Sequence, residues 1–267
     1  MKVISSIQNP LIREIIQLRE KSRKRKQSGK FLVEGQRELS LALSGDYEFT
    51  TILFNAGIIG LDKVESLIGF AKSSPEIIEV SDDVYEKMSY RQSTEGIIGI
   101  ALSKTHLLSD LEFSTKTPLI LIAEAPEKPG NIGALLRTAD AANLDAVIIA
   151  NPKTDLYNPN IIRSGVGCLF TRQVATGTTS EIIDFLKSRN IYIYCAALTA
   201  SKPYHEIEYS EATAIVVGTE HDGLTETWLN ASDQNIIIPM QGTIDSMNVS
   251  VSAAIIIFEA KRQRKFL

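Results

Sequence analysis

Five short apolar runs recur along the second half of the chain, separated by stretches in which apolar residues follow helical spacing. The runs are LILIA, AVIIA, IYIYCAA, AIVVG and NIIIP, at residues 119–123, 146–150, 191–197, 214–218 and 235–239. Strands that are apolar on both faces are typical of a parallel sheet covered by helices on each side. The sequence therefore predicts an α/β domain over residues 118–267.

The first half of the chain alternates in the same way with shorter elements. It opens with apolar residues at near-helical spacing, at positions 7, 11, 12, 15, 16 and 18. Predicted strands and helices then alternate: strands at 31–35, near 51, at 76–80 and at 96–101, and helices at 36–43, 61–72 and 81–88, the last with Ser81 as N-cap. A polar stretch at 103–117 ends at Pro118, so we predict a first α/β domain over residues 1–105.

The composition limits the class of protein. Of 267 residues, 44% are hydrophobic and 22% charged, which is ordinary for a globular protein. No apolar run approaches the roughly 18 residues of a membrane span, and the N-terminus has no apolar signal region, so a cytoplasmic protein without membrane association is expected. Cys168 and Cys195 form no CxxC pair and the three histidines are scattered, which predicts no metal site. Two buried thiols are expected, with a disulfide as the alternative.

Charge is unevenly distributed. The net charge is −4, yet residues 19–30 carry seven basic residues and one acidic residue. Local positive density is what phosphate binding requires, so this run predicts contacts with the phosphates of a nucleic acid by Arg23, Lys24, Arg25 and Lys26. The alternative is a solvated helix face. A second basic group, at 261–265, lies near the C-terminus.

Three loops follow the predicted strands of the second domain, where α/β sheets bind ligands. In the first, Pro129 and Gly130 predict a turn, Asn131 is predicted as a helix N-cap, and Arg137 lies at the edge of the buried helix face. For Arg137 the alternative is a surface salt bridge.

The second loop, residues 218–224, places Glu220 between two glycines directly after an apolar strand. Glycines let the backbone turn tightly and approach a ligand closely. The alternative for Glu220 is a cap on the next helix. The spacing matches neither a dinucleotide-binding GxGxxG nor a Walker GxxxxGK sequence.

The third loop, residues 238–250, collects Gly242, Ser246 and Asn248 before a long apolar helix. Either Ser246 or Asn248 is a candidate N-cap, and the density of small polar residues predicts backbone contact with a polar ligand.

Together the three loops resemble the signature motifs of the SpoU (TrmH-like) family of the SPOUT methyltransferases, over roughly residues 118–264. The N-x-G-x-x-x-R motif is matched by Asn131, Gly133 and Arg137. The G-x-E-x-x-G-L motif is matched by Gly218, Glu220, Gly223 and Leu224. The I-P-M-x-G and S-L-N-V-S motifs are matched by residues 238–242 and 246–250, with Met247 where leucine is usual and Ser252 where alanine is usual.

The resemblance implies a fold, a cofactor and partners. It implies a SPOUT-type parallel sheet with a trefoil knot, a smaller ribosomal-protein-like α/β domain at the N-terminus that binds RNA, and a homodimer. It also implies S-adenosylmethionine as methyl donor. The cofactor-binding residues it implies are Leu198, Gly218, Thr219, Gly223, Ile238, Met240 and Met247.

The implied reaction is methylation of a ribose 2′-hydroxyl. By this resemblance Arg137 orients and activates the hydroxyl, and Glu220 anchors the loops or Arg137. Asn131, Ser246 and Asn248 position the ribose or its phosphate. Ribosomal RNA is favoured over transfer RNA by the ribosomal-protein-like first domain.

Two other classes of protein are weighed against this interpretation. One is a non-catalytic RNA-binding or assembly factor on the same scaffold, which would have no use for the residues of the three loops. The other is a nicotinamide-dependent oxidoreductase, whose glycine fingerprint is missing here.

Overall fold

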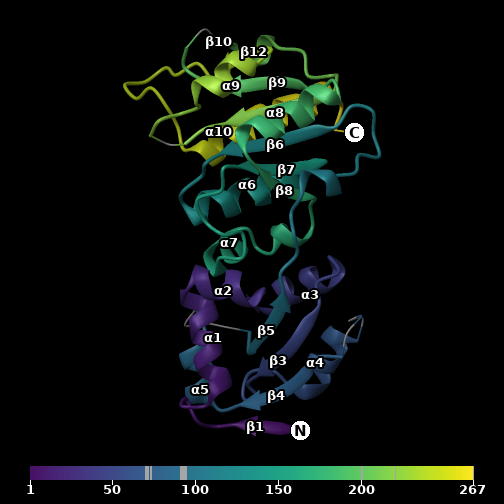
Figure 1. Cartoon of the computed structure of the whole chain (residues 1–267), viewed down its shortest axis with the longest axis vertical. Coiled ribbons are helices and arrows are strands. Elements are labelled where there is room, and N and C mark those ends of the chain that lie inside the picture. Colours follow the sequence, from purple (N-terminus) through teal and green to yellow (C-terminus); the bar gives the residue numbers. More distant parts are fainter. Residues whose placement is uncertain (70–71, 73, 91–94, 200, 220, 267) are drawn as a thin grey trace. The chain divides into compact units, whose positions relative to one another are not determined.

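The computed structural model describes residues 1–69, 72, 74–90, 95–199, 201–219 and 221–266 (Figure 1). Its contacts divide the chain into two compact units. The first comprises Met1–Thr105 together with Asp155–Thr171, and the second His106–Thr154 together with Arg172–Leu267. Each unit is built around its own sheet.

The first unit contains a mixed five-stranded sheet in the order β1-β4-β3-β5-β2. The strands are β1 (Lys2–Ile4), β2 (Lys30–Glu34), β3 (Phe49–Phe54), β4 (Glu76–Val80) and β5 (Ile97–Leu102). The helices between them are α1 (Pro10–Glu20), α2 (Ser22–Ser28), α3 (Gln36–Ser44), α4 (Leu61–Ile68) and α5 (Asp82–Met88). Strand β4 pairs in parallel with β1 and β3, whereas β5 pairs antiparallel with β2 and β3.

Helix α1 shows how the local sequence sets an element of this unit. Asn9 caps the helix by accepting from the backbone N–H of Leu11 at 2.9 Å, and Pro10 occupies the first turn, where its missing N–H is harmless. Ile12, Ile15 and Leu18 then fall on one face and are fully buried. The amphipathic helix predicted from the sequence is thus confirmed.

The segment Asp155–Thr171 belongs to the first unit, although the sequence analysis places it in the second domain. It contains α7 (Pro159–Ser164), which packs against β2. The Phe31 ring lies 4.1 Å from that of Tyr157 and 6.1 Å from that of Phe170, measured between centroids. This aromatic packing holds the segment in the first unit, and no local pattern in the sequence reports it.

The second unit contains a seven-stranded sheet in the order β10-β12-β9-β11-β6-β7-β8, in which every pair of neighbouring strands is parallel. The strands are β6 (Leu119–Glu124), β7 (Ala146–Ala150), β8 (Val174–Gly177), β9 (Tyr192–Ala196), β10 (Ser201–Pro203), β11 (Thr213–Val217) and β12 (Gln234–Ile237). The helices are α6 (Pro129–Ala141), α8 (Thr179–Ser188), α9 (Glu226–Ala231) and α10 (Val249–Gln263). The predicted parallel sheet is confirmed.

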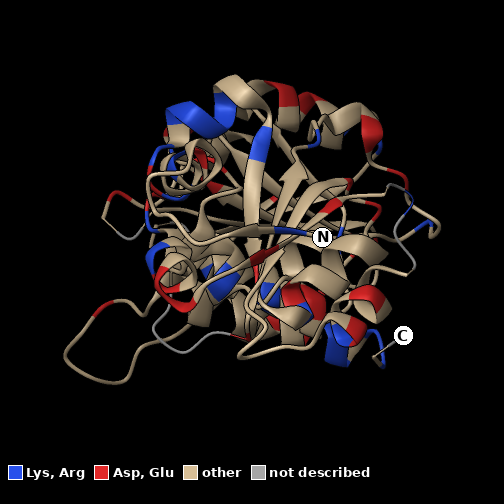
Figure 2. Cartoon of the chain, turned by 90° about the horizontal axis from the view of Figure 1, so that it is seen from below, with Lys and Arg blue, Asp and Glu red and all other residues tan. Residues whose placement is uncertain are grey.

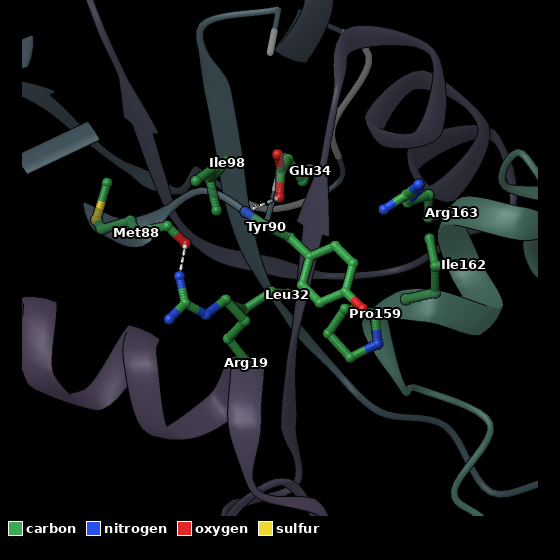
Figure 3. A pocket seen from close by; sticks show the side chains of 9 residues that line it. All are labelled: Arg19, Leu32, Glu34, Met88, Tyr90, Ile98, Pro159, Ile162 and Arg163. Carbon is green, nitrogen blue, oxygen red and sulfur yellow. Dashed lines mark hydrogen bonds between the residues drawn. The ribbon is translucent and has the colours of Figure 1, made fainter. Parts of the chain in front are cut away.

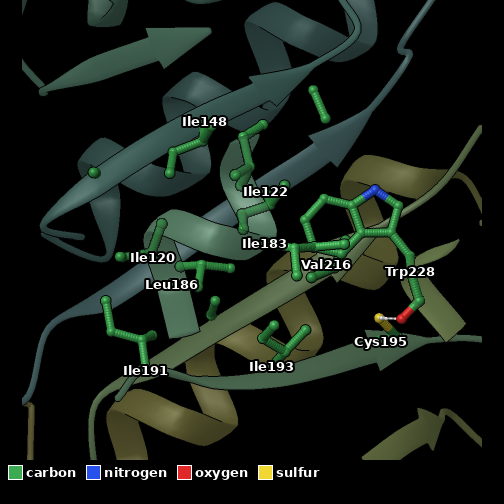
Figure 4. Close-up of a cluster of buried hydrophobic side chains, with 14 of the residues drawn as sticks. Ile120, Ile122, Ile148, Ile183, Leu186, Ile191, Ile193, Cys195, Val216 and Trp228 are labelled. Carbon is green, nitrogen blue, oxygen red and sulfur yellow. Dashed lines mark hydrogen bonds between the residues drawn. The ribbon is translucent and has the colours of Figure 1, made fainter. Parts of the chain in front are cut away.

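The core of the second unit follows from strands that are apolar on both faces. Every residue of β6, β7 and β11 is buried. Figure 4 shows Ile122, Ile148 and Val216 from these strands together with Ile183 of α8 and Trp228 of α9. Burying each aliphatic side chain of this kind contributes roughly 1.5–3 kcal/mol, so this cluster is the main reason that the strand ends are held in fixed positions. Among the described residues, no helix is both long and apolar enough to cross a membrane.

Candidate active site

One edge of the second sheet gathers all three loops singled out in the sequence. Strands β12, β9, β11 and β6 are consecutive neighbours and run in parallel, so their carboxyl ends meet at the same edge. The segments 125–128, 197–199, 218–219, 221–224 and 238–248 follow the strands there. The physics of the parallel sheet therefore brings together residues that lie more than a hundred positions apart.

A buried carboxylate at the end of β6 is hydrogen-bonded to the residue that follows the loop after β11. Glu124, the last residue of β6, is 2% exposed. Its carboxylate accepts from the backbone N–H and the hydroxyl of Thr225, both at 2.9 Å, and from the hydroxyl of Thr179 at 3.1 Å. Thr225 ends the loop after β11, so Glu124 fixes the exit of that loop to β6. No role for Glu124 was predicted from the sequence, although a single carboxylate at the end of an apolar run is a recognisable signal.

The loop after β11 needs its two glycines. The Thr219 N–H donates to the Gly223 carbonyl at 3.0 Å, which folds the loop back on itself. A Cβ on Gly218 would lie 2.2 Å from the Gly223 carbonyl, and Gly223 itself has φ +67°. A side chain is therefore excluded at Gly218 by the backbone of Gly223, and at Gly223 it would be strained by the left-handed backbone conformation. Glu220, predicted as a catalytic residue, lies outside the described residues.

The first and third loops meet through two asparagines. The Asn248 side-chain NH₂ donates to the Asn131 side-chain oxygen at 3.2 Å. Asn248 is also the N-cap of α10, accepting from the Ser250 N–H at 2.9 Å, which decides between the two predicted candidates for that cap. Asn131 is not the N-cap of α6, because the helix begins at Pro129 with Lys128 as the cap. Its side-chain nitrogen is buried and has no hydrogen-bond partner among the described residues.

Arg137 and Ser246 complete the predicted catalytic set. Arg137 is exposed on α6, six residues or about 9 Å of helix rise beyond Asn131, and makes no ion pair with any described residue. Ser246 is exposed and donates to the Asp245 carboxylate at 3.1 Å. The structure therefore joins Asn131 and Asn248 directly, while no hydrogen bond or ion pair between described residues joins Arg137 or Ser246 to them.

The predicted cofactor-binding residues lie beyond β9, β11 and β12 at this edge. Leu198 is 61% exposed and Ile244 is 68% exposed, while Ile238, Met240 and Met247 are half-buried. Apolar side chains left open beside backbone donors and acceptors suit an adenine ring and its polar substituents. The residues present thus fit S-adenosylmethionine.

The described residues offer few candidate ligands for a metal ion. No group of three or more His, Cys, Asp or Glu is placed to hold an ion in that part of the chain. Cys168 and Cys195 are both buried thiols, not a disulfide. Burial raises the pKa of the Cys195 thiol to about 12, which keeps it neutral.

The basic run is only partly a free surface. Arg23 and Lys26 on α2 are exposed and Lys24 is half-buried. Arg25, by contrast, is 5% exposed, and its guanidinium donates to both carboxylate oxygens of Asp155 at 3.1 and 2.7 Å and to the Leu18 carbonyl at 2.6 Å. The prediction that Arg25 contacts RNA is therefore replaced by a structural role, because its charge is already paired.

Comparison with known proteins finds a family model for each half of the chain. The model described as SpoU rRNA Methylase family matches residues 118–258, and the model described as MRM3-like substrate binding domain matches residues 9–99. The 23S rRNA (guanosine(2553)-2′-O)-methyltransferase RlmP of Bacillus subtilis (strain 168) is 29% identical over 262 residues, which are 98% of this chain and 100% of that protein.

Solved structures of RNA methyltransferases share the fold of this chain. An RNA 2′-O ribose methyltransferase is 37% identical with a TM-score of 0.84, over 98% of this chain and 99% of that one. An AdoMet-bound rRNA methyltransferase from Sinorhizobium meliloti, 24% identical, shares the fold with a TM-score of 0.89 over 98% and 97% of the two chains. With its three motifs gathered at one sheet edge and more than half its length matched by the family model, this chain belongs to the SpoU rRNA methylase family.

Proposed function

We propose that this chain methylates the ribose 2′-hydroxyl of a nucleotide in ribosomal RNA. As a member of its family it is an RNA methyltransferase that uses S-adenosylmethionine. The proposal is carried by the hydrogen bond between Asn131 and Asn248, which places the first and third motifs in contact beside the glycine loop of the second. The target class is supported by a relative that matches this chain over nearly its full length and is named for ribose methylation of 23S rRNA.

The chemistry needs an aligned oxygen and a path for one proton. When bound, S-adenosylmethionine supplies a methyl carbon on a positively charged sulfur. A ribose hydroxyl is a weak nucleophile, and its oxygen gains negative charge as the proton leaves. We propose that the exposed Arg137 guanidinium donates hydrogen bonds to this oxygen and stabilises that charge.

The remaining residues position the groups that react. Asn131, whose side chain is oriented by Asn248, is proposed to position the ribose or its phosphate. Asn248 and Ser246 lie on the loop opposite and are exposed. Glu220 is proposed to anchor the loop after β11. The cofactor residues are Leu198, Gly218, Thr219, Gly223, Ile238, Met240 and Met247. Arg23, Lys24 and Lys26 of α2 are proposed to contact RNA phosphates.

The active enzyme is proposed to be a homodimer that docks through α10. This helix buries Ala253, Ile256 and Ala260 on one face, yet Val251 and Phe258 on the opposite face are 48% and 41% exposed. A helix that is apolar on both sides normally has partners on both sides. A second copy of the chain is the partner that family resemblance implies.

The finer fold is proposed from the same resemblance. The second unit, residues 118–267, would carry a trefoil knot around the cofactor, and the first, residues 1–105, would be a ribosomal-protein-like α/β domain for substrate RNA. We propose that the enzyme acts in the cytoplasm, as a ribosomal RNA substrate would suit.

Mapping 2′-O-methylation in total RNA tests the function. A strain lacking the gene should lose one or more ribosomal RNA marks, which wild-type protein restores and Arg137→Ala does not. Arg189→Ala, an exposed arginine on the second unit away from the three loops, serves as the matched control and should restore the mark. Loss of a transfer RNA mark instead would overturn the substrate, and an unchanged methylation map would overturn the reaction.

A further inference from the structure

A pocket in the first unit is used by none of the residues discussed above as catalytic or cofactor-binding. Figure 3 shows it between α1, β2, β5, the end of α5 and α7. It is lined by Arg19, Leu32, Glu34, Met88, Tyr90, Ile98, Pro159, Ile162 and Arg163. Its enclosed part is small, about 30 Å³, so a ligand larger than water would bind across its mouth.

The mouth of the pocket presents an aromatic ring on a fixed backbone. Tyr90 is 44% exposed. Its N–H donates to the Glu34 carboxylate at 2.8 Å. Arg19 donates to the carbonyls of the three preceding residues, 87 to 89, at 3.0, 3.3 and 2.9 Å. These contacts hold the backbone on the N-terminal side of Tyr90, so little conformational entropy remains to be lost when a ligand stacks on the ring.

An arginine faces the same ring. The Arg163 guanidinium carbon lies 5.6 Å from the Tyr90 ring centroid, and Arg163 is exposed without an ion-pair partner among the described residues. Behind them, Leu32, Ile98 and Ile162 form an apolar floor. A planar ring beside a planar cation over an apolar floor suits a flat heteroaromatic ligand.

The surroundings favour a ligand that also carries phosphates. Helix α2 begins three residues after Arg19 and holds four basic residues and no acidic one. The Arg25–Asp155 pair ties α2 to the chain that leads into α7, so the basic helix and the Arg163 wall belong to one framework. Figure 2 shows blue and red positions interspersed in this view, so a basic site here is local and does not reflect an overall charge.

We propose that this pocket binds one unpaired base of the substrate RNA, stacked on Tyr90 and flanked by Arg163, while exposed α2 cations contact neighbouring phosphates. The proposal rests on the proposed RNA methyltransferase function. It also gives the segment Asp155–Thr171 a purpose, since this part of the region matched by the methylase model supplies one wall of an RNA site on the first unit.

The test measures binding of a fluorescein-labelled 12-nucleotide single-stranded RNA to the full-length protein by anisotropy. Tyr90→Ala should weaken binding about tenfold or more, the usual effect of losing one base–aromatic stack, and Tyr90→Phe should stay within about twofold of wild type. Arg163→Ala should weaken binding as well. Tyr192→Ala is the matched control, because Tyr192 is 47% exposed but lies on β9 of the second unit.

Three further measurements separate this site from the reaction and from misfolding. Each variant should keep the wild-type thermal midpoint and affinity for S-adenosylmethionine, and Tyr90→Ala should raise the KM for RNA while leaving kcat within about twofold. Folded Tyr90→Ala that binds single-stranded RNA as tightly as wild type would overturn the pocket and leave the proposed function intact. If the wild-type protein binds this RNA through Tyr90 but methylates no ribosomal RNA, the proposed function is overturned and the pocket is kept.

Discussion

The side chain of Asn248 donates to the side-chain oxygen of Asn131 across 117 positions of sequence, at 3.2 Å. Asn248 therefore has two duties, because its own oxygen also caps α10 through the Ser250 N–H at 2.9 Å. The bond orients the Asn131 amide, whose nitrogen has no partner among the described residues. One residue thus couples the start of α10 to the amide that is proposed to position the substrate.

Substitutions at Asn248 should separate these two duties. Asn248→Ser keeps a good N-cap but is too short to reach Asn131, so we expect a wild-type thermal midpoint with methyl transfer reduced tenfold or more, about 1.4 kcal/mol in the activation free energy. Asn248→Ala should lose activity and, in addition, about 1 kcal/mol of stability. Thermal unfolding and single-turnover assays give both readouts. Full activity in Asn248→Ser would show that the bridge has no catalytic role.

Glu124 should be essential to the loop after β11 although it is not placed on any substrate. It is 2% exposed and accepts hydrogen bonds from Thr225 and Thr179. Glu124→Ala would leave the buried Thr179 hydroxyl without this acceptor, which costs roughly 1–3 kcal/mol, and would release the exposed Thr225 from the end of β6. We expect a lower thermal midpoint and weaker binding of S-adenosylmethionine by calorimetry.

Glu124→Gln provides the comparison for that variant. It retains one acceptor oxygen and similar volume, so it should recover part of both properties. Cofactor affinity that is unchanged in Glu124→Ala would mean that the loop is held in place without this carboxylate.

How far the sequence predicts the fold depends on how local each signal is. The strands β6, β7 and β11 are buried on both faces, so their apolar runs are visible in the sequence and were predicted. The strands β1 and β10 have three residues each and were missed, because they lie at sheet edges with mostly exposed or half-buried side chains.

In the candidate site, too, local features could be predicted from the sequence and long-range contacts could not. The turn-forming glycines of the loop after β11 follow from local backbone geometry, and the N-cap of α10 was narrowed to Ser246 or Asn248, of which the structure shows Asn248. The N-cap assigned to Asn131 was wrong, because Pro129 already supplies the first helical residue. The partnership between Arg25 and Asp155 spans 130 positions, so no local pattern could distinguish a paired arginine from the phosphate-binding neighbours that it resembles.

The two cysteines should be unreactive in the folded protein. Cys195 is fully buried and Cys168 is 7% exposed. Burial raises the pKa of Cys195 to about 12, above its usual range, so at pH 8 it stays a neutral thiol, and the thiolate is the reactive form. Ellman's reagent at pH 8 should therefore detect no rapidly reacting thiol until denaturant is added, when two should react. A fast reaction of one thiol in the native protein would show that its surroundings open.

Because Arg25 is paired with Asp155, we expect its removal to lower stability, whereas removal of its exposed neighbours Arg23 and Lys26 should weaken RNA binding instead. The side chains of Arg25 and Asp155 are 4% and 9% exposed, and the guanidinium contacts both carboxylate oxygens. Arg25→Ala would leave the Asp155 carboxylate buried without a counter-charge, which costs about 3–5 kcal/mol. Arg23→Ala with Lys26→Ala removes only exposed charges and should leave the thermal midpoint unchanged.

The same variants should also differ in how their RNA affinity depends on salt concentration. Removing two phosphate-contacting cations should lower the slope of log affinity against log salt by about two for the Arg23→Ala, Lys26→Ala variant. The double variant Arg25→Met, Asp155→Leu removes both buried charges at once, so it should recover most of the stability lost in Arg25→Ala while keeping the wild-type salt slope. If Arg25→Ala instead were as stable as wild type and reduced the salt slope, Arg25 would be an RNA contact and the buried pair would have no structural role.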